Sequence, residues 1–259
     1  VVAQHAQDPR LTEGAQMNEG DVSAELGLTG WPGVAEESII ARDVMLAETL
    51  GSRLHICHLS TARSVEIIRW AKQRGVAVTA EVTPHHLLLT DELARTYDPV
   101  YKVNPPLRTS ADVTALREAL IDGTIDIIAT DHAPHPAEAK ECEWDAAAFG
   151  MVGLETAVSV AQLVLIESGL SNWNRLAEVM SINPAQIAGD QDQGQHLAAG
   201  TVANIALVDP SAQREVKAAT ESKSLNNPYA GMILPGRVMH TVFRGRFTVK
   251  NGSVVEGAR

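Results

Sequence analysis

The sequence predicts an α/β protein with parallel strands, and three observations support this fold class. Short apolar segments of strand character alternate with segments of helical spacing through about the first 200 residues, and parallel neighbours need such crossover connections. Polar residues, above all histidine and aspartate, follow the apolar segments directly, which is typical of buried parallel strands that deliver chemistry at their carboxyl ends. The 259 residues, 45% of them hydrophobic and 20% charged, suffice for a sizeable core.

The predicted elements follow one another in β-then-α order. Strands are predicted for residues 1–4, 53–59, 76–82 and 125–130, and helices for residues 34–50, 62–74, 111–120 and 154–167. Residues that commonly begin or end helices stand at the expected places, namely Gly51, Ser60 or Thr61, Gly75, Ser110 and Gly123. Residues 83–110, which contain Asn104-Pro105-Pro106, read as a long irregular stretch.

From about Ala199 the pattern changes to strand-rich segments separated by turns. We therefore predict two domains: a βα domain at 1–198 and a small β-sandwich appendage at 199–259. The βα domain holds four βα units, whereas a complete (β/α)8 barrel needs roughly 250 residues. The alternatives are a small open sheet or the carboxyl-terminal half of a larger protein. Because the chain opens at Val1-Val2 within a predicted strand and without a methionine, we expect the true amino terminus to lie upstream.

The composition excludes several functional classes. A net charge of −11 argues against nucleic-acid binding, which needs a basic surface. Two cysteines, Cys57 and Cys142, are too few for a disulfide scaffold and fit a reducing cytoplasm. No apolar run approaches the ~18–20 residues of a membrane span. We expect a cytoplasmic protein that binds neither nucleic acid nor membrane.

Asp131 is the strongest candidate for a functional residue. It follows the apolar run Ile127-Ile128-Ala129-Thr130, where a carboxylate is costly to bury without a metal or a partner. Beside a metal it could take and return a proton as a general base and acid. The alternative is a helix cap or a loop salt bridge. His135 lies four residues further on and could reach the same cleft.

Two histidines end other predicted strands. His5 follows residues 1–4 and His58 ends residues 53–59, so both are candidate metal ligands, although a single histidine at such a position is more often structural. On an extended strand His55 and His58 point to opposite faces, and we interpret His55 as a packing residue. We interpret Cys57 as a small core residue and not as a metal ligand, because no second cysteine lies at ligand spacing. His85 and His86 diverge if the chain there is extended, which favours structural roles for both.

Five motifs together resemble a known family. They are Val2-Ala-Gln-His5-Ala-Gln-Asp8, His55-Ile-Cys-His58-Leu-Ser-Thr61, Glu81-Val-Thr-Pro-His-His-Leu87, Lys102-Val-Asn104-Pro-Pro-Leu-Arg108 and Thr130-Asp131-His-Ala-Pro-His135. They occur in this order in bacterial dihydroorotases of the type I branch of the amidohydrolase superfamily, and the resemblance covers essentially the whole chain. Dihydropyrimidinases and allantoinases share the His, His and Asp pattern but usually differ at the loop of Asn104.

The resemblance implies a TIM-type (β/α)8 barrel of which this chain supplies strands 5–8. It implies that His5, His58 and Asp131 are metal ligands for one or two Zn2+ ions, with Asp131 also the catalytic acid and base. It implies that Asn104, His135, Phe149 and Gly150 bind substrate. The implied reaction is the reversible cyclisation of N-carbamoyl-L-aspartate to L-dihydroorotate in pyrimidine biosynthesis.

The family also has a His-x-His metal pair on the first strand and a carboxylate or modified lysine on the fourth, and neither lies in these 259 residues. We therefore expect the missing half of the barrel to be a partner, and little activity from this segment alone. A homodimer and an assembly with aspartate carbamoyltransferase are further candidate partners. The alternative functions are another cyclic amidase, such as an allantoinase or a dihydropyrimidinase, and a non-catalytic homologue that scaffolds aspartate carbamoyltransferase.

Overall fold

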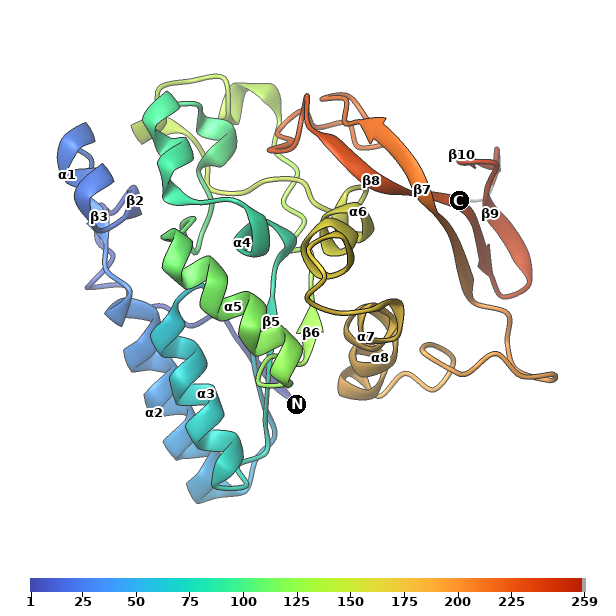
Figure 1. Cartoon of the computed structure of the whole chain (residues 1–259). Coiled ribbons are helices and arrows are strands. Elements are labelled where there is room, and N and C mark those ends of the chain that lie inside the picture. The colour runs from blue at the N-terminus through green and yellow to red at the C-terminus, as the bar shows by residue number, and fades with distance from the viewer. Residues whose placement is uncertain (258–259) are drawn as a thin grey trace. The chain divides into compact units, whose positions relative to one another are not determined.

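The structure is a computed structural model that describes residues 1–257 (Figure 1). The chain divides into two compact units. The first consists of Val1–Glu155 and Ala218–Pro228, and the second consists of Thr156–Lys217 and the residues from Tyr229 onward. The domain boundary predicted at residue 198 stays a prediction. None of the helices in residues 1–257 combines the length and the apolar character that a membrane crossing requires.

The first unit is built on a four-stranded parallel sheet with strand order β1-β4-β5-β6. The strands are β1 (Val2–Gln4), β4 (Leu54–Ile56), β5 (Val78–Val82) and β6 (Ile127–Ile128). The parallel pairing confirms the prediction, although the strands are shorter than predicted. Each strand pairs with the next one in this βα series, which is the arrangement of successive units in a (β/α)8 barrel.

Each connection between neighbouring strands contains one helix of twelve or more residues: α2 (Val34–Leu50), α3 (Ala62–Gln73) and α5 (Ser110–Asp122). In α3 the residues Ser64, Val65, Ile68 and Ala71 are buried, a spacing of three and four that turns one face of the helix to the core. Figure 1 shows α2, α3 and α5 as successive neighbours along the sheet. The predicted N-cap Ser110 is wrong by one residue, because the hydroxyl of Thr109 accepts the hydrogen bond from the amide of Asp112.

The remaining elements of the first unit are short. They are α1 (Asp21–Leu26), the parallel pair β2 (Met17–Asn18) and β3 (Gly30–Trp31), α4 (Pro84–Leu88), and the 3-10 turns Asp91–Thr96, Pro99–Tyr101, Ala137–Ala139 and Trp144–Ala146. The stretch predicted as irregular therefore begins with a helix. Pro84 stands in the first turn of α4, where its missing N–H costs nothing, and Thr83 caps that helix through the amide of His86.

The second unit combines helices with an antiparallel sheet. Its helical elements are α6 (Ala157–Ala161), the π-helical segments Gln162–Glu167 and Glu178–Ile182, α7 (Trp173–Ala177) and α8 (Asn183–Ala188). Its sheet has the order β10-β9-β8-β7, with β7 (Ile205–Glu215), β8 (Ile233–Phe243), β9 (Arg246–Lys250) and β10 (Ser253–Val254). The appendage is therefore strand-rich as predicted, and its sandwich form stays a prediction. The predicted helix 154–167 begins three residues later, at Ala157.

A buried polar network ties the loops of the first unit together. Glu36 of α2 is 3% exposed and accepts hydrogen bonds from the amide of Ser60 at 3.0 Å and from the hydroxyl of Ser64 at 2.6 Å. The hydroxyl of Ser60 also donates to Glu36 and accepts from Nε of Arg108 at 3.0 Å. Arg108 is 1% exposed and donates through Nη1 to Trp31 O and Asn18 Oδ1. Burial lowers the pKa of Arg108, an effect that the nearby Glu36 opposes.

We predict that Glu36→Leu lowers the free energy of unfolding by ~3 kcal/mol or more, because it strips the donors on Ser60 and Ser64 of their acceptor and leaves Arg108 without its buried counter-charge. The matched control is Glu48→Leu on the same helix, which removes only an exposed pair with Arg74 and should cost less than ~1 kcal/mol. Urea unfolding of both variants measures the difference, and equal losses would contradict the prediction.

Candidate metal and substrate site

Three predicted site residues follow strands of the same parallel sheet. His5 follows β1, His58 follows β4 and Asp131 follows β6. The carboxyl ends of parallel strands meet at one edge of a sheet, which is where barrel enzymes carry out their chemistry. His58 is buried, Asp131 is half-buried and His5 is exposed. The edge therefore presents two imidazoles and a carboxylate at different depths.

The structure brings His5 and His58 into direct contact. Nδ1 of His5 lies 2.9 Å from Nε2 of His58, and the two rings meet edge to face with centroids 4.7 Å apart. Two nitrogens that share a tetrahedral Zn2+ at ~2.0–2.1 Å each are about 3.3 Å apart. The observed pair is within a few tenths of an ångström of that separation. These two nitrogens fit a metal.

A third side chain selects the nitrogen that His5 offers. Nε2–H of His5 donates to Oε1 of Gln7 at 2.8 Å, and Nε2 of Gln7 donates to Thr12 Oγ1 at 2.7 Å. Because Gln7 Oε1 can only accept, the proton of His5 is on Nε2 and its Nδ1 keeps a lone pair. Metal-binding histidines are commonly oriented in this way through the other ring nitrogen.

The electrostatic surroundings of His58 favour its neutral form. Burial lowers the pKa of His58, and the neighbouring His5 lowers this pKa further, while the carboxylates of Asp131, Glu36 and Glu81 oppose the change. A neutral imidazole has a free lone pair, so this shift favours metal binding.

The backbone is strained at two of the three candidate ligands, His58 and Asp131. His58 has φ 35° and Asp131 has φ 44°, in the left-handed region that residues other than glycine seldom adopt. Such a residue costs of order 1–3 kcal/mol and persists only where neighbouring contacts hold it. Strain at two strand ends of one edge is a pattern typical of functional sites.

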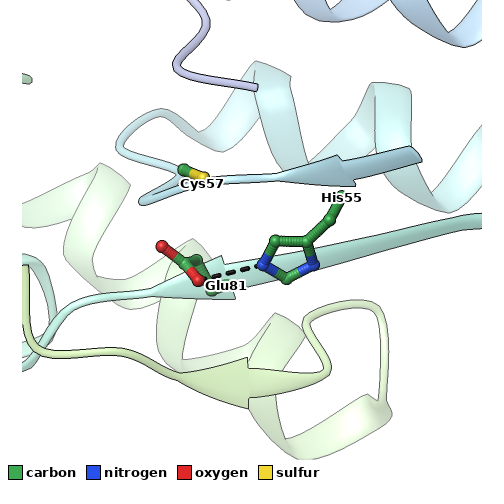
Figure 2. Close-up of side chains that lie close together, drawn as sticks. All are labelled: His55, Cys57 and Glu81. Carbon is green, nitrogen blue, oxygen red and sulfur yellow. Dashed lines mark hydrogen bonds and ion pairs between the residues drawn. The ribbon is translucent and has the colours of Figure 1, made fainter. Parts of the chain in front are cut away.

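The third predicted ligand, Asp131, is near His58 but does not converge with the two histidines. Within residues 1–257, the one group of three metal-binding side chains whose ligand atoms converge is His55, Cys57 and Glu81, within 4.8 Å of one another (Figure 2). Nε2 of His55 lies 2.9 Å from Glu81 Oε2, and its Nδ1 lies 2.8 Å from Thr79 Oγ1. Burial raises the pKa of the Cys57 thiol to about 11, and the charges of Glu81 and Asp131 add to this effect.

The predicted substrate residue Asn104 lies beside the histidine pair. Its Nδ2 donates to Gln7 Oε1 at 3.1 Å, so one glutamine oxygen holds both His5 and Asn104. Its Oδ1 is buried and has no hydrogen-bond partner among the described residues. An acceptor buried without a partner is costly, and a ligand N–H would satisfy it.

The other three predicted substrate residues are in contact with one another. Nε2–H of His135 donates to the carbonyl of Phe149 at 2.9 Å. Gly150 has φ 133°, and a side chain there would place Cβ 2.8 Å from Nε2 of His135, so only glycine allows this approach. Asn226 holds the segment by donating from Nδ2 to the carbonyls of Ala133 and Gly150.

Two buried lysines, Lys102 and Lys140, also contact this segment. Nζ of Lys102 lies 4.5 Å from the ring centre of Phe149 and donates to Trp144 O at 2.6 Å. Nζ of Lys140 donates to the carbonyls of Lys102 and Ala148. Burial lowers the pKa of Lys140 to about 8, and the charge of Lys102 contributes to this shift.

His85 and His86 lie on helix α4, so the expectation of extended chain there is wrong. Their ring centroids are 4.6 Å apart, and both side chains are buried. His86 has a structural role, since its Nε2–H donates to the carbonyls of Pro105 and Pro106 in the loop of Asn104. Burial lowers the pKa of His86 to about 3, so it is neutral at physiological pH.

Gln7, Glu81 and Asn226 also belong to the site, although none of the three was among the predicted site residues. Gln7 and Glu81 stand within motifs that were recognised, and Glu81 shares a face of β5 with Thr79 by strand alternation, so spacing held a signal for both. No local pattern in the sequence shows that Asn226 is buried against Gly150.

Comparison with known proteins reveals extensive similarity. A family model described as the amidohydrolase family matches residues 34–248, and a dihydro-orotase-like model matches residues 1–64. A dihydroorotase of Streptomyces coelicolor is 66% identical over 255 residues, which are 98% of this chain and 60% of the relative. A dihydroorotase of Mycobacterium tuberculosis is 52% identical over 98% of this chain and 59% of the relative. The chain thus spans about 60% of the length of these relatives.

Solved structures of two related enzymes share the fold. L-hydantoinase (dihydropyrimidinase) from Arthrobacter aurescens aligns with a TM-score of 0.85 and 30% identity, over 98% of this chain and 58% of that one. Dihydropyrimidinase from Brevibacillus agri aligns with a TM-score of 0.84 and 25% identity, over 98% of this chain and 57% of that one. The parallel sheet and the antiparallel sheet are therefore those of a TIM-barrel amidohydrolase fold, of which the chain is a part.

We predict that Gln7→Leu weakens Zn2+ binding to the intact protein on the order of 10-fold, because His5 loses the acceptor that sets its tautomer and orientation. Titration against a competing chelator measures the affinity. Gln73→Leu, at an exposed glutamine on α3, is the control and should leave the affinity unchanged. Equal affinities in the two variants would rule out this role for Gln7.

We predict a pH-dependent stability that originates at Lys140. Its pKa of about 8 in the folded protein lies below the ordinary value of ~10.4, so protonation of this lysine penalises the folded state at pH values below 8. The penalty disappears as the pH rises from 8 toward 10.4. Relative to Lys140→Met, the wild type should gain ~1–2 kcal/mol between pH 7 and pH 10, after allowance for solvent screening.

Urea unfolding at the two pH values measures the effect of Lys140. Lys223→Met removes an exposed lysine and should retain the wild-type pH dependence. If Lys140→Met also retains the wild-type pH dependence of stability, that dependence does not originate at Lys140.

Proposed function

The chain belongs to the amidohydrolase family, and on that premise we propose that it is part of a zinc-dependent dihydroorotase. The proposed reaction is the reversible cyclisation of N-carbamoyl-L-aspartate to L-dihydroorotate. The dihydroorotases that match at 52–66% identity support this substrate over that of the hydantoinases, which match at 30% identity or less among those compared.

The observation that carries the proposal is the pair of facing nitrogens on His5 and His58, 2.9 Å apart beyond the ends of two adjacent parallel strands. Asp131 follows β6 at the same edge, close enough for its charge to act on His58. A non-catalytic scaffold has no need of two strained strand ends that hold an imidazole and a carboxylate.

A Zn2+ held by His5 and His58 would supply Lewis-acid activation of water and of the ring amide carbonyl. The residues of the chain would then move the proton. In the hydrolytic direction Asp131 accepts a proton from the attacking water and returns it to the leaving ring nitrogen, and in cyclisation it performs the same transfers in reverse.

Asn104 and the segment around His135 would hold the substrate. The partnerless Oδ1 of Asn104 is suited to accept an N–H of the dihydropyrimidine ring, a group that dihydroorotate carries. Nε2–H of His135 donates to the carbonyl of Phe149, so its Nδ1 carries a lone pair and would accept an N–H of the substrate. The backbone of Phe149 and Gly150 would line the ring.

The chain spans about 60% of its relatives, so the remaining ligands of the metal centre belong, in this proposal, to a further part of the protein. We also place that protein in the cytoplasm, because two cysteines fit a reducing compartment. A homodimer and an assembly with aspartate carbamoyltransferase stay predictions.

We predict that Asp131→Ala in the intact enzyme lowers kcat by ~1,000-fold or more while the thermal midpoint changes little, because the proton carrier is lost but the fold is retained. Dihydroorotate hydrolysis and N-carbamoyl-L-aspartate cyclisation measure both directions. Asp190→Ala, at an exposed position, serves as the control. Near-normal turnover in Asp131→Ala would remove Asp131 from the mechanism.

The substrate class is tested by a panel of rings on the wild-type enzyme. Dihydroorotate should be hydrolysed with the highest kcat/KM among dihydroorotate, dihydrouracil, hydantoin and allantoin. A preference for one of the other three would assign a different cyclic amidase. Bound zinc without hydrolysis of any ring would favour the scaffold alternative.

A further inference from the structure

The backbone at His58 is held by two neighbouring strands. The amide of Cys57 donates to Gln4 O at 2.9 Å and the amide of Leu59 donates to Glu81 O at 2.9 Å. Between them, the left-handed turn at His58 points its amide at a side chain, and this N–H donates to Oε1 of Glu81 at 3.2 Å. The amides of Cys57 and Leu59 thus donate to backbone carbonyls of the neighbouring strands, whereas the amide of His58 donates to the side-chain carboxylate of Glu81.

A chain of side chains behind Glu81 fixes the direction of its carboxylate. Oε2 of Glu81 accepts from Nε2–H of His55 at 2.9 Å, as Figure 2 shows. His55 is 5% exposed, and its Nδ1 is hydrogen-bonded to Thr79 Oγ1 at 2.8 Å. His55 and Thr79 are register partners on β4 and β5, and Thr79 and Glu81 share one face of β5. The chain Thr79–His55–Glu81 is thus anchored on two rigid strands.

We propose that Glu81, oriented by His55 and Thr79, is a positioning residue that holds the turn at His58 so that Nε2 of His58 faces Nδ1 of His5. This inference rests on the proposed function, because it takes His5 and His58 as metal ligands. Glu81 acts through the backbone of His58 and does not itself touch the metal.

The same residues could be interpreted as a metal site of their own, since the ligand atoms of His55, Cys57 and Glu81 lie within 4.8 Å of one another. The geometry favours support for His58. Both ring nitrogens of His55 and both carboxylate oxygens of Glu81 already have partners within the protein. A metal ion would have to break the bond between His55 and Glu81. The two interpretations predict different effects for Cys57 and for the charge of Glu81.

The test compares Zn2+ affinity and zinc content of the intact enzyme across a matched set of variants. Glu81→Met keeps the approximate length of the side chain and removes the acceptor, and it should weaken Zn2+ binding on the order of 10- to 100-fold. Glu81→Gln keeps an oxygen for the amide of His58, so its affinity should stay within about 3-fold of wild type. Cys57→Ala should leave both affinity and zinc content unchanged.

Apo-protein thermal midpoints are recorded alongside, so that a loss of affinity can be separated from a loss of folding. If Glu81→Met does not fold, Thr79→Val is the variant that tests the inference. It removes only the hydrogen bond between Thr79 and His55 and should weaken Zn2+ binding by about 3-fold. Wild-type affinity in folded Glu81→Met, or failing that in Thr79→Val, would overturn the inference.

The remaining outcomes separate this inference from the proposed function. Loss of one zinc equivalent in both Cys57→Ala and Glu81→Gln would establish a separate metal site and overturn the positioning role. A wild-type enzyme with neither zinc nor turnover would overturn the proposed function and this inference together. If the wild-type enzyme has both zinc and turnover, and Glu81→Met leaves the Zn2+ affinity unchanged, this inference alone would be overturned.

Discussion

A single buried network, Glu36 with Ser60 and Arg108, determines where the loops of the site can lie. Ser60 follows His58 by two residues and Arg108 follows Asn104 by four, so the network joins the segment of a candidate metal ligand to that of a candidate substrate residue. Loss of one partner in such a network leaves a buried charge or donor uncompensated. These hydrogen bonds therefore restrict where the two loops can lie.

The site is assembled from strained turns on rigid strands. His58 and Asp131 adopt left-handed backbone conformations two and three residues after β4 and β6, and both strands pair with β5 in regular parallel register. Strain of this kind persists because surrounding hydrogen bonds outweigh it. For His58 those bonds come from Gln4 and Glu81 on the two neighbouring strands. The position of His58 therefore depends on which strands lie beside β4.

Much of the fold could be predicted because the spacing of apolar residues that indicates a helix or a strand lies within that element's own sequence. Helix α2 ends where Gly51 predicts it, and the parallel order of the strands follows from the βα alternation. Helices α7 and α8 were missed, since they are five and six residues long and separated by a π-helical segment. The expectation for His85 and His86 failed because Pro84 begins a helix instead of continuing a strand.

The sequence by itself determined the kind of chemistry: an acid and two histidines at strand ends, in motifs that resemble one enzyme family. Only the tertiary structure decided how the groups meet. His5 and His58 are 53 residues apart, and Gln7 and Asn104 are 97 apart. Strand-end position is encoded by short apolar runs that can be read locally. A hydrogen bond between distant residues depends on strand order, register and backbone turns, and these are set by packing across the whole sheet.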